Sequence, residues 1–360
     1  MNHETEKNNK REKILHGLVV VNHLKTPLLG MNRSIVITEP YLRMRGIHLH
    51  FMAVSSLYRF SLSVLKIFLK EKHFQFDFVI FNSLSSLNHF GPFGYPLARF
   101  ILTLRIPLFI YWHETAWAFK RMGKEHPRYA AKVDRIASDD RVIHLTVSHA
   151  CSLCIRKHYP DSKLIKIYNA TFIPKIFDKP LTPSCPPIVV NIASIQERKG
   201  TDLFVKTAIK VCNKHPTVKF IWIGDGEKFG TWKDEIEMAG LQQRILFPGF
   251  IASPYQLLSH SSIFFLSSRD DPFPLSVQEA MCLGRTIAAF DVGGTPEALG
   301  GLGILIKPFD TDEAAYKILK CLGKSPEKLI NHALRNRYYN LYTAEHLAAR
   351  MSKVIRSHIY

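Results

Sequence analysis

The sequence predicts an α/β protein built from two doubly wound domains that face each other across a cleft. Strand-like and helical stretches alternate along the chain, and this alternation stops and restarts at a proline-rich stretch. The length of 360 residues is enough for two separate cores. Because the expected strands are nearly continuous apolar runs, the sheets should be parallel and covered by helices on both faces.

In the first half, short apolar runs predict strands at 15–21, 47–54, 76–82, 107–113 and 143–148, with a short last strand at 165–168. Between them, apolar residues recur at the wider spacing of helices at 35–45, 57–70, 96–104 and 130–137. A stretch at 174–187 contains several prolines and is the expected linker. We therefore expect a first domain at 1–180.

The alternation resumes after the linker. Strands are expected at 188–193, 219–224, 245–248, 263–267, 286–290 and 303–306, and helices at 202–213, 228–239, 254–259, 276–282 and 296–299. The segment 313–360 should be helical. These elements predict a second domain at 181–342 and a C-terminal helix at 343–360 that packs back on the first domain.

Charge is distributed unevenly between the two halves. Up to Ser184 there are 27 Lys/Arg and 13 Asp/Glu, a net +14, whereas the remaining 21 Lys/Arg and 17 Asp/Glu give +4. This basic first half indicates an anionic partner, either a glycan, a lipid-linked glycan or an anionic membrane surface, although a purely solvated basic surface stays open. We expect no nucleic acid, because no nucleic-acid-binding motif is present.

The polar start and the lack of long apolar runs favour a cytoplasmic protein, one that can touch the inner face of the cytoplasmic membrane. The six cysteines are expected to be reduced, without a metal site. The Asp-x-Asp sequence at 310–312 is better explained as a helix cap than as a metal ligand.

The most informative stretch reads Asp-Pro-Phe-Pro-Leu-Ser-Val-Gln-Glu and runs from Asp271 to Glu279. One carboxylate follows a buried strand and the second lies just inside the next helix. Two such carboxylates can accept hydrogen bonds from sugar hydroxyls, while the helix N-terminus offers N–H groups to a phosphate. The alternative is a capping box between Ser276 and Glu279, which needs no ligand.

Other strand ends carry similar candidates. Lys199, with Arg198 beside it, follows the first strand of the second half and could bind a diphosphate. Gly224 follows the next strand, where a glycine lets the backbone approach a ligand or simply make a tight turn. A third loop contains Gly293 and Gly294 before a short helix.

Taken in order, these loops resemble those of the glycosyltransferase family 4 enzymes, over about 188–308 and more loosely before it. This resemblance implies the GT-B fold of two facing Rossmann-like domains and retaining transfer of sugar from a nucleotide sugar. By position it implies that Glu279 holds the ribose, Asp271 the transferred sugar and Lys199 the diphosphate. Phe273 and Leu275 lie where the family's backbone amides meet the ligand.

The chain also departs from this family pattern. Asp271 replaces the usual Glu, Pro272 and Pro274 each remove an N–H donor, and Ser194 stands where the family has a phosphate-binding arginine. Arg198 or a residue of the first domain would have to replace that arginine.

Two first-half residues belong to the same resemblance. Gly30 is the candidate for the family's glycine loop, and His113 matches the histidine that faces the reacting sugar, although an ordinary structural histidine is an equal alternative.

The sequence thus predicts a metal-independent, retaining glycosyltransferase without a cofactor, whose donor substrate is a nucleotide sugar. Its expected acceptor is an anionic glycan or a lipid-linked glycan in cell-envelope polysaccharide biosynthesis. Two alternatives stay open: an epimerase or phosphorylase of the same fold, and a non-catalytic protein that binds nucleotides or nucleic acid. A dehydrogenase is disfavoured, because no Gly-x-Gly-x-x-Gly follows the first strand.

Overall fold

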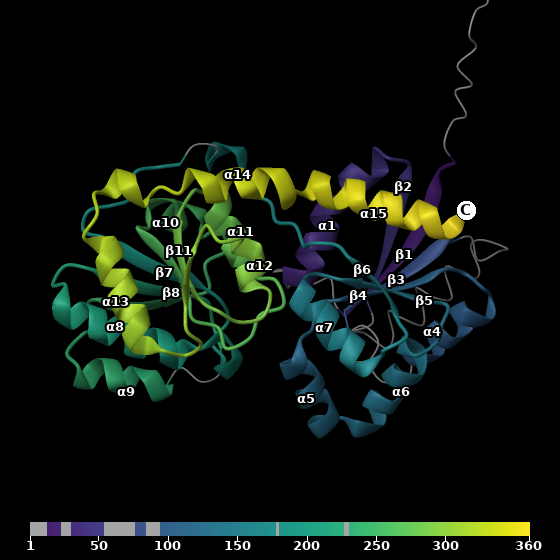
Figure 1. The fold of residues 1–360 in the computed structure, drawn as a ribbon, viewed down its shortest axis with the longest axis horizontal. Helices are drawn as coiled ribbons and strands as arrows, with labels where there is room; N and C mark the ends of the chain where they lie inside the picture. Colours follow the sequence, from purple (N-terminus) through teal and green to yellow (C-terminus); the bar gives the residue numbers. More distant parts are fainter. Residues whose placement is uncertain (1–12, 23–29, 54–75, 84–93, 178–179, 227–229) are drawn as a thin grey trace, which may run out of the picture.

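The computed structural model describes residues 13–22, 30–53, 76–83, 94–177, 180–226 and 230–360. These residues form two six-stranded sheets, each built of parallel strands and flanked by helices (Figure 1). The helix expected at 57–70 lies outside the described residues. The two-sheet α/β fold predicted from the alternation of elements is therefore confirmed.

The first sheet has the strand order β2-β1-β3-β4-β5-β6. Its strands are β1 (Leu15–Val21), β2 (Ile47–Ala53), β3 (Phe78–Asn82), β4 (Leu108–Trp112), β5 (Val142–Thr146) and β6 (Lys163–Lys166). Its helices are α1 (Gly30–Arg43), α4 (Gly94–Thr103), α5 (Ala116–Glu125), α6 (Pro127–Ala137) and α7 (His149–His158). Strands β3, β4 and β5 are buried along their whole length, as expected for a sheet covered on both faces.

Several elements of this half differ from the sequence prediction. Helix α5 has no counterpart in that prediction, because only two of its residues, Phe119 and Met122, are buried and the rest of its surface is polar. Helix α1 begins at Gly30 instead of Ile35. Strand β6 ends at Lys166, two residues before the predicted end, and its accessible edge position gives it a weak apolar signal.

The second sheet has the order β12-β11-β10-β7-β8-β9. Its strands are β7 (Ile188–Ile192), β8 (Lys219–Ile223), β9 (Ile245–Gly249), β10 (Ile263–Leu266), β11 (Thr286–Phe290) and β12 (Ile304–Ile306). Its helices are α8 (Thr201–Lys214), α9 (Gly230–Met238), α10 (Tyr255–His260), α11 (Leu275–Cys282), α12 (Thr295–Leu299) and α13 (Thr311–Leu322). Short 3-10 turns occur at η1 (Lys175–Phe177), η2 (Glu197–Lys199) and η3 (Pro326–Leu329).

This is the strand order of the Rossmann fold, in which the chain reverses direction across the sheet between β7 and β10. Ligands of such sheets bind at the carboxyl ends of the strands beside that reversal. The loops that follow β7 and β10 are therefore the place where a ligand site is expected.

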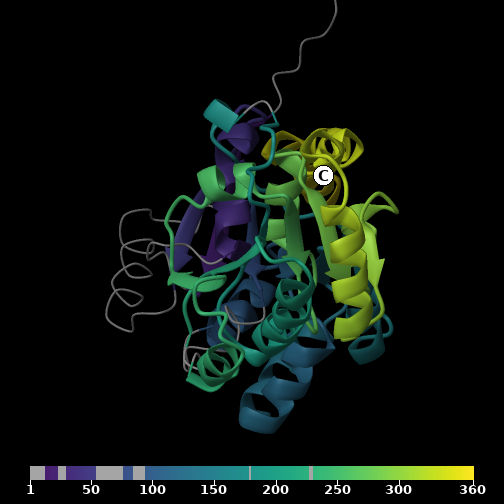
Figure 2. The same cartoon turned by 90° about the vertical axis from the view of Figure 1, so that its left-hand side faces the viewer.

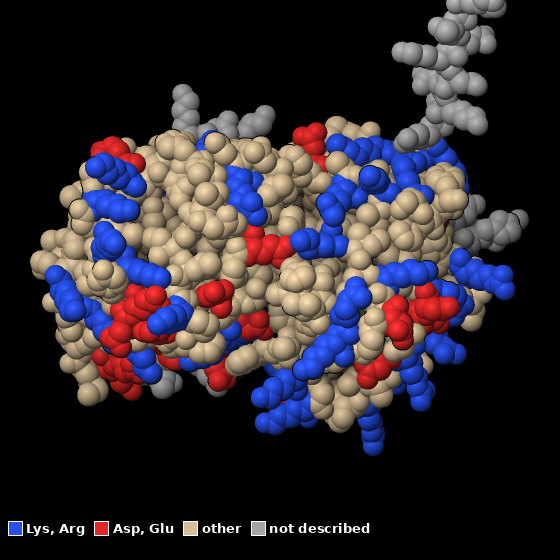
Figure 3. Space-filling view, in the orientation of Figure 1, with Lys and Arg blue, Asp and Glu red and all other residues tan. Residues whose placement is uncertain are grey.

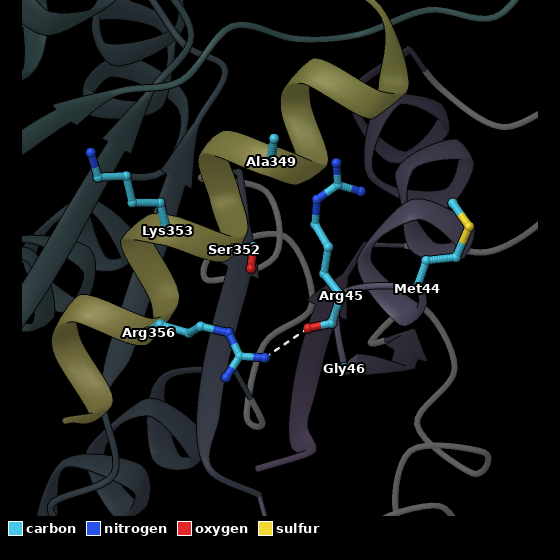
Figure 4. A pocket seen from close by; sticks show the side chains of 7 residues that line it. All are labelled: Met44, Arg45, Gly46, Ala349, Ser352, Lys353 and Arg356. Atoms are coloured by element: carbon cyan, nitrogen blue, oxygen red, sulfur yellow. Dashed lines mark hydrogen bonds between the residues drawn. The ribbon is translucent and has the colours of Figure 1, made fainter. Parts of the chain in front are cut away.

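The last two helices, α14 (His332–Leu341) and α15 (Ala344–Ile359), carry the chain from the second sheet back to the first (Figure 1). Helix α15 packs on α1, and the view turned by 90° shows the C-terminal helices along one edge of the molecule (Figure 2). A hollow of about 480 Å³ lies between the end of α1 and α15, where the Arg356 guanidinium donates to the Arg45 carbonyl at 2.7 Å (Figure 4). Within the described residues, every helix is too short or too polar to cross a membrane.

Candidate functional site

The loops after β7 and β10 bring Lys199 and Asp271 into contact. The Lys199 ammonium forms an ion pair with the Asp271 carboxylate, and both side chains are largely buried, at 17% and 5% exposure. Burial lowers the pKa of Lys199, an effect that the neighbouring Asp271 carboxylate opposes. Two residues that lie 72 positions apart in sequence thus form one charged pair at the strand ends.

A third loop closes over this pair. Gly293 has φ +56°, and a Cβ at this position would lie 2.1 Å from the Asp271 carbonyl oxygen. Only glycine tolerates both this backbone conformation and this approach. The next N–H, that of Gly294, donates to the same carbonyl at 2.9 Å. The glycines of this loop therefore hold the backbone of Asp271 in place.

Glu279 lies on α11 and is 4% exposed. Helix α11 begins at Leu275, so Ser276 lies inside the helix instead of at its N-cap, and no side chain caps α11. Glu279 Oε1 instead accepts hydrogen bonds from Arg33 Nη1 at 2.8 Å and from Thr171 Oγ1 at 3.3 Å. The capping box is therefore not formed, and Glu279 points towards the first domain.

Arg33 on α1 is a site residue that the sequence did not predict. Besides its ion pair with Glu279, its guanidinium donates to the Phe172 carbonyl at 3.1 Å and to the Tyr255 hydroxyl. Burial raises the pKa of Glu279, and the Arg33 charge opposes this shift. The sequence contained one indirect signal for such a residue. Because Ser194 stands where the family has a phosphate-binding arginine, a cation from elsewhere in the chain was needed.

Two helix N-termini meet beside these carboxylates. Gly30 opens α1 and Leu275 opens α11, and a Cβ on Gly30 would lie 3.3 Å from Leu275 Cδ1. A helix N-terminus presents N–H groups and a partial positive charge, so an anion between the two termini would be favoured by both. Between the two carboxylates in sequence, the Phe273 ring stacks on Tyr168 with a centroid distance of 4.9 Å.

His113 follows β4 and is 8% exposed. Its Nε2 lies 3.1 Å from Asn82 Oδ1, and Asn82 in turn donates to Asn32 Oδ1 at 3.0 Å. Since the Asn82 oxygen only accepts, His113 must carry its proton on Nε2. Its Nδ1 is then a lone-pair acceptor, and this buried atom has no hydrogen-bond partner within the described residues. Burial lowers the pKa of His113 to about 3, so the imidazole is neutral at pH 7.

Arg198 and Gly224, two further predicted site residues, contact other groups, and Asp310 is the predicted helix cap. The Arg198 guanidinium donates to the Asp270 carbonyl at 2.8 Å and lines a separate cavity beside α5. Gly224 has φ +140°, and a Cβ there would lie 2.1 Å from the Ala193 carbonyl, so backbone packing alone accounts for this glycine. Asp310 caps α13 through bonds to the N–H groups of Asp312 and Glu313.

The chain is similar in sequence to known glycosyltransferases. Residues 172–337 match the sequence profile described as "Glycosyl transferases group 1". A phosphatidylinositol N-acetylglucosaminyltransferase subunit from Arabidopsis thaliana is 26% identical over 67% of this chain and 54% of its own length. Poly(ribitol-phosphate) alpha-N-acetylglucosaminyltransferase of Staphylococcus aureus is 28% identical over 45% of this chain and 32% of its own length.

Among solved structures, Anabaena HepE in complex with UDP-glucose superimposes with a TM-score of 0.73 over 95% of this chain and 100% of its own, at 18% identity. The two Rossmann-like domains therefore have the GT-B fold. The match to the group 1 glycosyl transferases covers residues 172–337, a little less than half of the chain. The chain spans about half the length, or less, of these two curated relatives.

Proposed function

We propose that this protein is a retaining, metal-independent glycosyltransferase that moves a sugar from a nucleotide-sugar donor to an anionic glycan or lipid-linked glycan. One observation carries this proposal: Asp271, Lys199, Glu279 and the N-termini of α1 and α11 gather at the carboxyl ends of the strands, between the two domains. A nucleotide sugar has a matching sugar, diphosphate and ribose. The HepE complex with UDP-glucose supports the same class of donor.

In this proposal each residue has one task. Glu279 Oε1 is held by Arg33 and Thr171, and Oε2 is the oxygen that would accept from a ribose hydroxyl. Lys199 and the two helix N-termini would stabilise the negative charge that develops on the leaving diphosphate. Asp271 would accept a hydrogen bond from a sugar hydroxyl, and so would His113 Nδ1.

The transfer itself exchanges one C–O bond for another. The bond between the sugar's anomeric carbon and the diphosphate breaks, with the electron pair leaving on the phosphate oxygen. The acceptor hydroxyl bonds to the same carbon on the face that the diphosphate vacates, so the anomeric configuration is retained. The leaving phosphate oxygen takes the acceptor's proton, so no protein base is assigned.

The charge of the first half supports an anionic acceptor. The net +14 up to Ser184 would attract a phosphorylated glycan or an anionic lipid surface, and would bring the enzyme to the inner face of the cytoplasmic membrane. Two relatives have phosphate-bearing molecules in their names, phosphatidylinositol and poly(ribitol-phosphate). Envelope polysaccharide biosynthesis is the process that fits such an acceptor.

A thermal-shift screen of nucleoside diphosphates and their sugar conjugates tests the donor site. A ligand that binds the folded chain raises its apparent stability by mass action, so one nucleotide series should raise the melting temperature. Released nucleoside diphosphate should then appear only when an acceptor is added. Product formation without an acceptor would instead favour an epimerase, and a shift without turnover on any envelope acceptor would favour a binding protein.

A further inference from the structure

A cavity of about 810 Å³ lies between the two domains, outside the Lys199–Asp271 pair. Its first-domain wall is one face of α5, which presents Trp117, Lys120, Arg121 and Lys124. Its second-domain wall contains the η2 turn with Arg198. In the space-filling view, Lys and Arg side chains gather over α5 where it borders the second domain (Figure 3).

The sequence of α5 explains why these cations share one wall. Positions 117, 120, 121 and 124 follow the three- and four-residue spacing that places side chains on one face of a helix. Phe119 and Met122 are buried on another face. The helix is therefore amphipathic, and its basic face is the one that borders the cavity.

The cations of this wall exceed the anions. Four cationic side chains and the two carboxylates of Glu125 and Glu197 line the cavity. Glu125 is already paired with Arg121 at 2.8 Å. Among the described residues, Lys120 and Lys124 have neither a hydrogen bond nor an ion pair within the chain. Although Lys120, Arg121 and Lys124 are exposed, positive charges gathered along a concave wall attract an anion more strongly than the same charges spread over a convex surface.

The cavity is connected to the Lys199–Asp271 pair through Arg198 and Asp270. Arg198 donates to the Asp270 carbonyl at 2.8 Å, and Asp270 immediately precedes Asp271. From the first domain, the Thr115 hydroxyl just before α5 donates to the Asp270 carboxylate. A molecule held in this cavity would thus reach the transferred sugar from the first-domain side.

We propose that the cavity between α5 and η2 binds a phosphate group of the acceptor, with Lys120 and Lys124 as its principal cations. The link of this cavity to the acceptor rests on the proposed glycosyltransferase function. Beyond that function, the inference names a phosphate-bearing acceptor as the substrate class and Lys120 and Lys124 as the residues that bind it. Trp117 gives the site a half-buried aromatic side chain beside the cations.

The test uses the full chain with UDP present, so that the phosphate site at Lys199 is occupied. Glycerol 1-phosphate is titrated and followed by tryptophan fluorescence, to which Trp117 at the cavity wall contributes. The double variant Lys120→Ala/Lys124→Ala should weaken its binding by about fivefold or more, since each exposed charge pair contributes modestly. Lys353→Ala, which removes an exposed charge from the hollow beside α15, is the matched control and should bind as the unsubstituted chain does.

The proposal is overturned if the double variant binds glycerol 1-phosphate normally, or if Lys353→Ala weakens binding as much. Phosphatidylglycerol and phosphatidylcholine vesicles distinguish the source of the phosphate. If the chain binds phosphatidylglycerol vesicles more tightly and glycerol 1-phosphate displaces it from them, the phosphate is lipid-borne. If glycerol 1-phosphate cannot displace the chain from the vesicles, a general basic surface binds them, and this result argues against the cavity.

The thermal shift by UDP is measured on the same variants. It should be unchanged by Lys120→Ala/Lys124→Ala, because these residues lie outside the donor site. If UDP and every other nucleotide fail to stabilise the chain while glycerol 1-phosphate binds at Lys120 and Lys124, the proposed glycosyltransferase function fails and the phosphate cavity stands.

Discussion

The two carboxylates of the candidate site are held in different ways. Asp271 pairs with Lys199, and both belong to loops of one sheet, so this half of the site is complete within the second domain. Glu279 pairs with Arg33, which comes from the first domain 246 positions earlier in the chain. The first pair can exist whatever the arrangement of the domains, whereas the second pair depends on that arrangement. We therefore expect Asp271 to govern chemistry and Glu279 to report on donor binding and domain closure.

The largest effect should come from Asp271→Asn. This change keeps the shape but removes the charge that pairs with Lys199 and that we propose to face the sugar. We expect kcat to fall by about 10²- to 10³-fold, as for loss of one preorganised transition-state contact, with nucleoside diphosphate affinity nearly unchanged. Steady-state kinetics and calorimetric titration measure the two quantities. If this variant had a normal kcat and weak nucleotide binding, Asp271 would have the nucleotide-binding role that we assign to Glu279.

Lys199→Ala should also reduce kcat strongly, and more than Arg198→Ala. Lys199 is the cation beside Asp271, whereas Arg198 is directed to the Asp270 carbonyl and the α5 cavity. The Arg198 variant is expected to raise the KM for the acceptor instead. Parallel kinetics on the two variants, with donor and acceptor varied in turn, test this split. Equal and full activity in the Lys199 variant would exclude that loop from the reaction.

Glu279→Ala should have an intermediate effect, on binding. A hydrogen bond to a charged group contributes about 1.5–3 kcal/mol, so nucleoside diphosphate affinity should fall by roughly tenfold to a hundredfold. The change also leaves the Arg33 guanidinium without its carboxylate partner. Calorimetry with the nucleotide that gives the largest thermal shift measures the loss. Unchanged affinity together with a lower melting temperature would assign Glu279 a purely structural role.

Arg33→Ala should have a smaller effect that depends on pH. Burial raises the pKa of Glu279 and Arg33 opposes this, so removing Arg33 should raise the pKa further. A larger fraction of Glu279 is then protonated near neutral pH and accepts ribose hydroxyls poorly. We expect nucleotide affinity to fall by about threefold to tenfold at pH 6.5, to recover as pH rises, and to be partly restored by Arg33→Lys. Tighter binding at every pH would show that Arg33 competes with the ribose.

The contrast between the Asp271–Lys199 pair within one domain and the Glu279–Arg33 pair between domains also explains which site residues the sequence could predict. Asp271, Lys199 and Gly293 follow apolar strands, and the strand order that unites them is the usual one for alternating strands and helices. Arg33 has no such local signal, because its partner lies in the other domain and ordinary amphipathic helices contain arginines too. Helix α5 escapes prediction for a related reason: its exposed basic face obscures its small buried face. The sequence thus reveals contacts made within one sheet better than contacts between the domains.

The smallest effect on activity is expected from pH, and it concerns the neutral imidazole of His113 on the first-domain side of the site. Burial lowers the pKa of His113 to about 3 and that of His144 to about 4, from an ordinary value of 6.5. Because the unfolded chain takes up these protons first as pH falls, stability should be greatest above pH 6.5 and decline towards pH 4. The expected slope is about 1.4 kcal/mol per pH unit for each histidine.

Denaturant unfolding of the unsubstituted chain and of His113→Asn between pH 4.5 and 7.5 measures this contribution, and the variant should lose the part of the slope due to His113. The pH dependence of kcat/KM for the unsubstituted chain should in turn show no histidine ionisation between pH 6 and 8. A step near pH 6.5 that disappears in His113→Asn would mean that His113 is accessible and titrates normally. In that case His113 would change its charge near neutral pH, and the assignment of a neutral imidazole to the site would not hold.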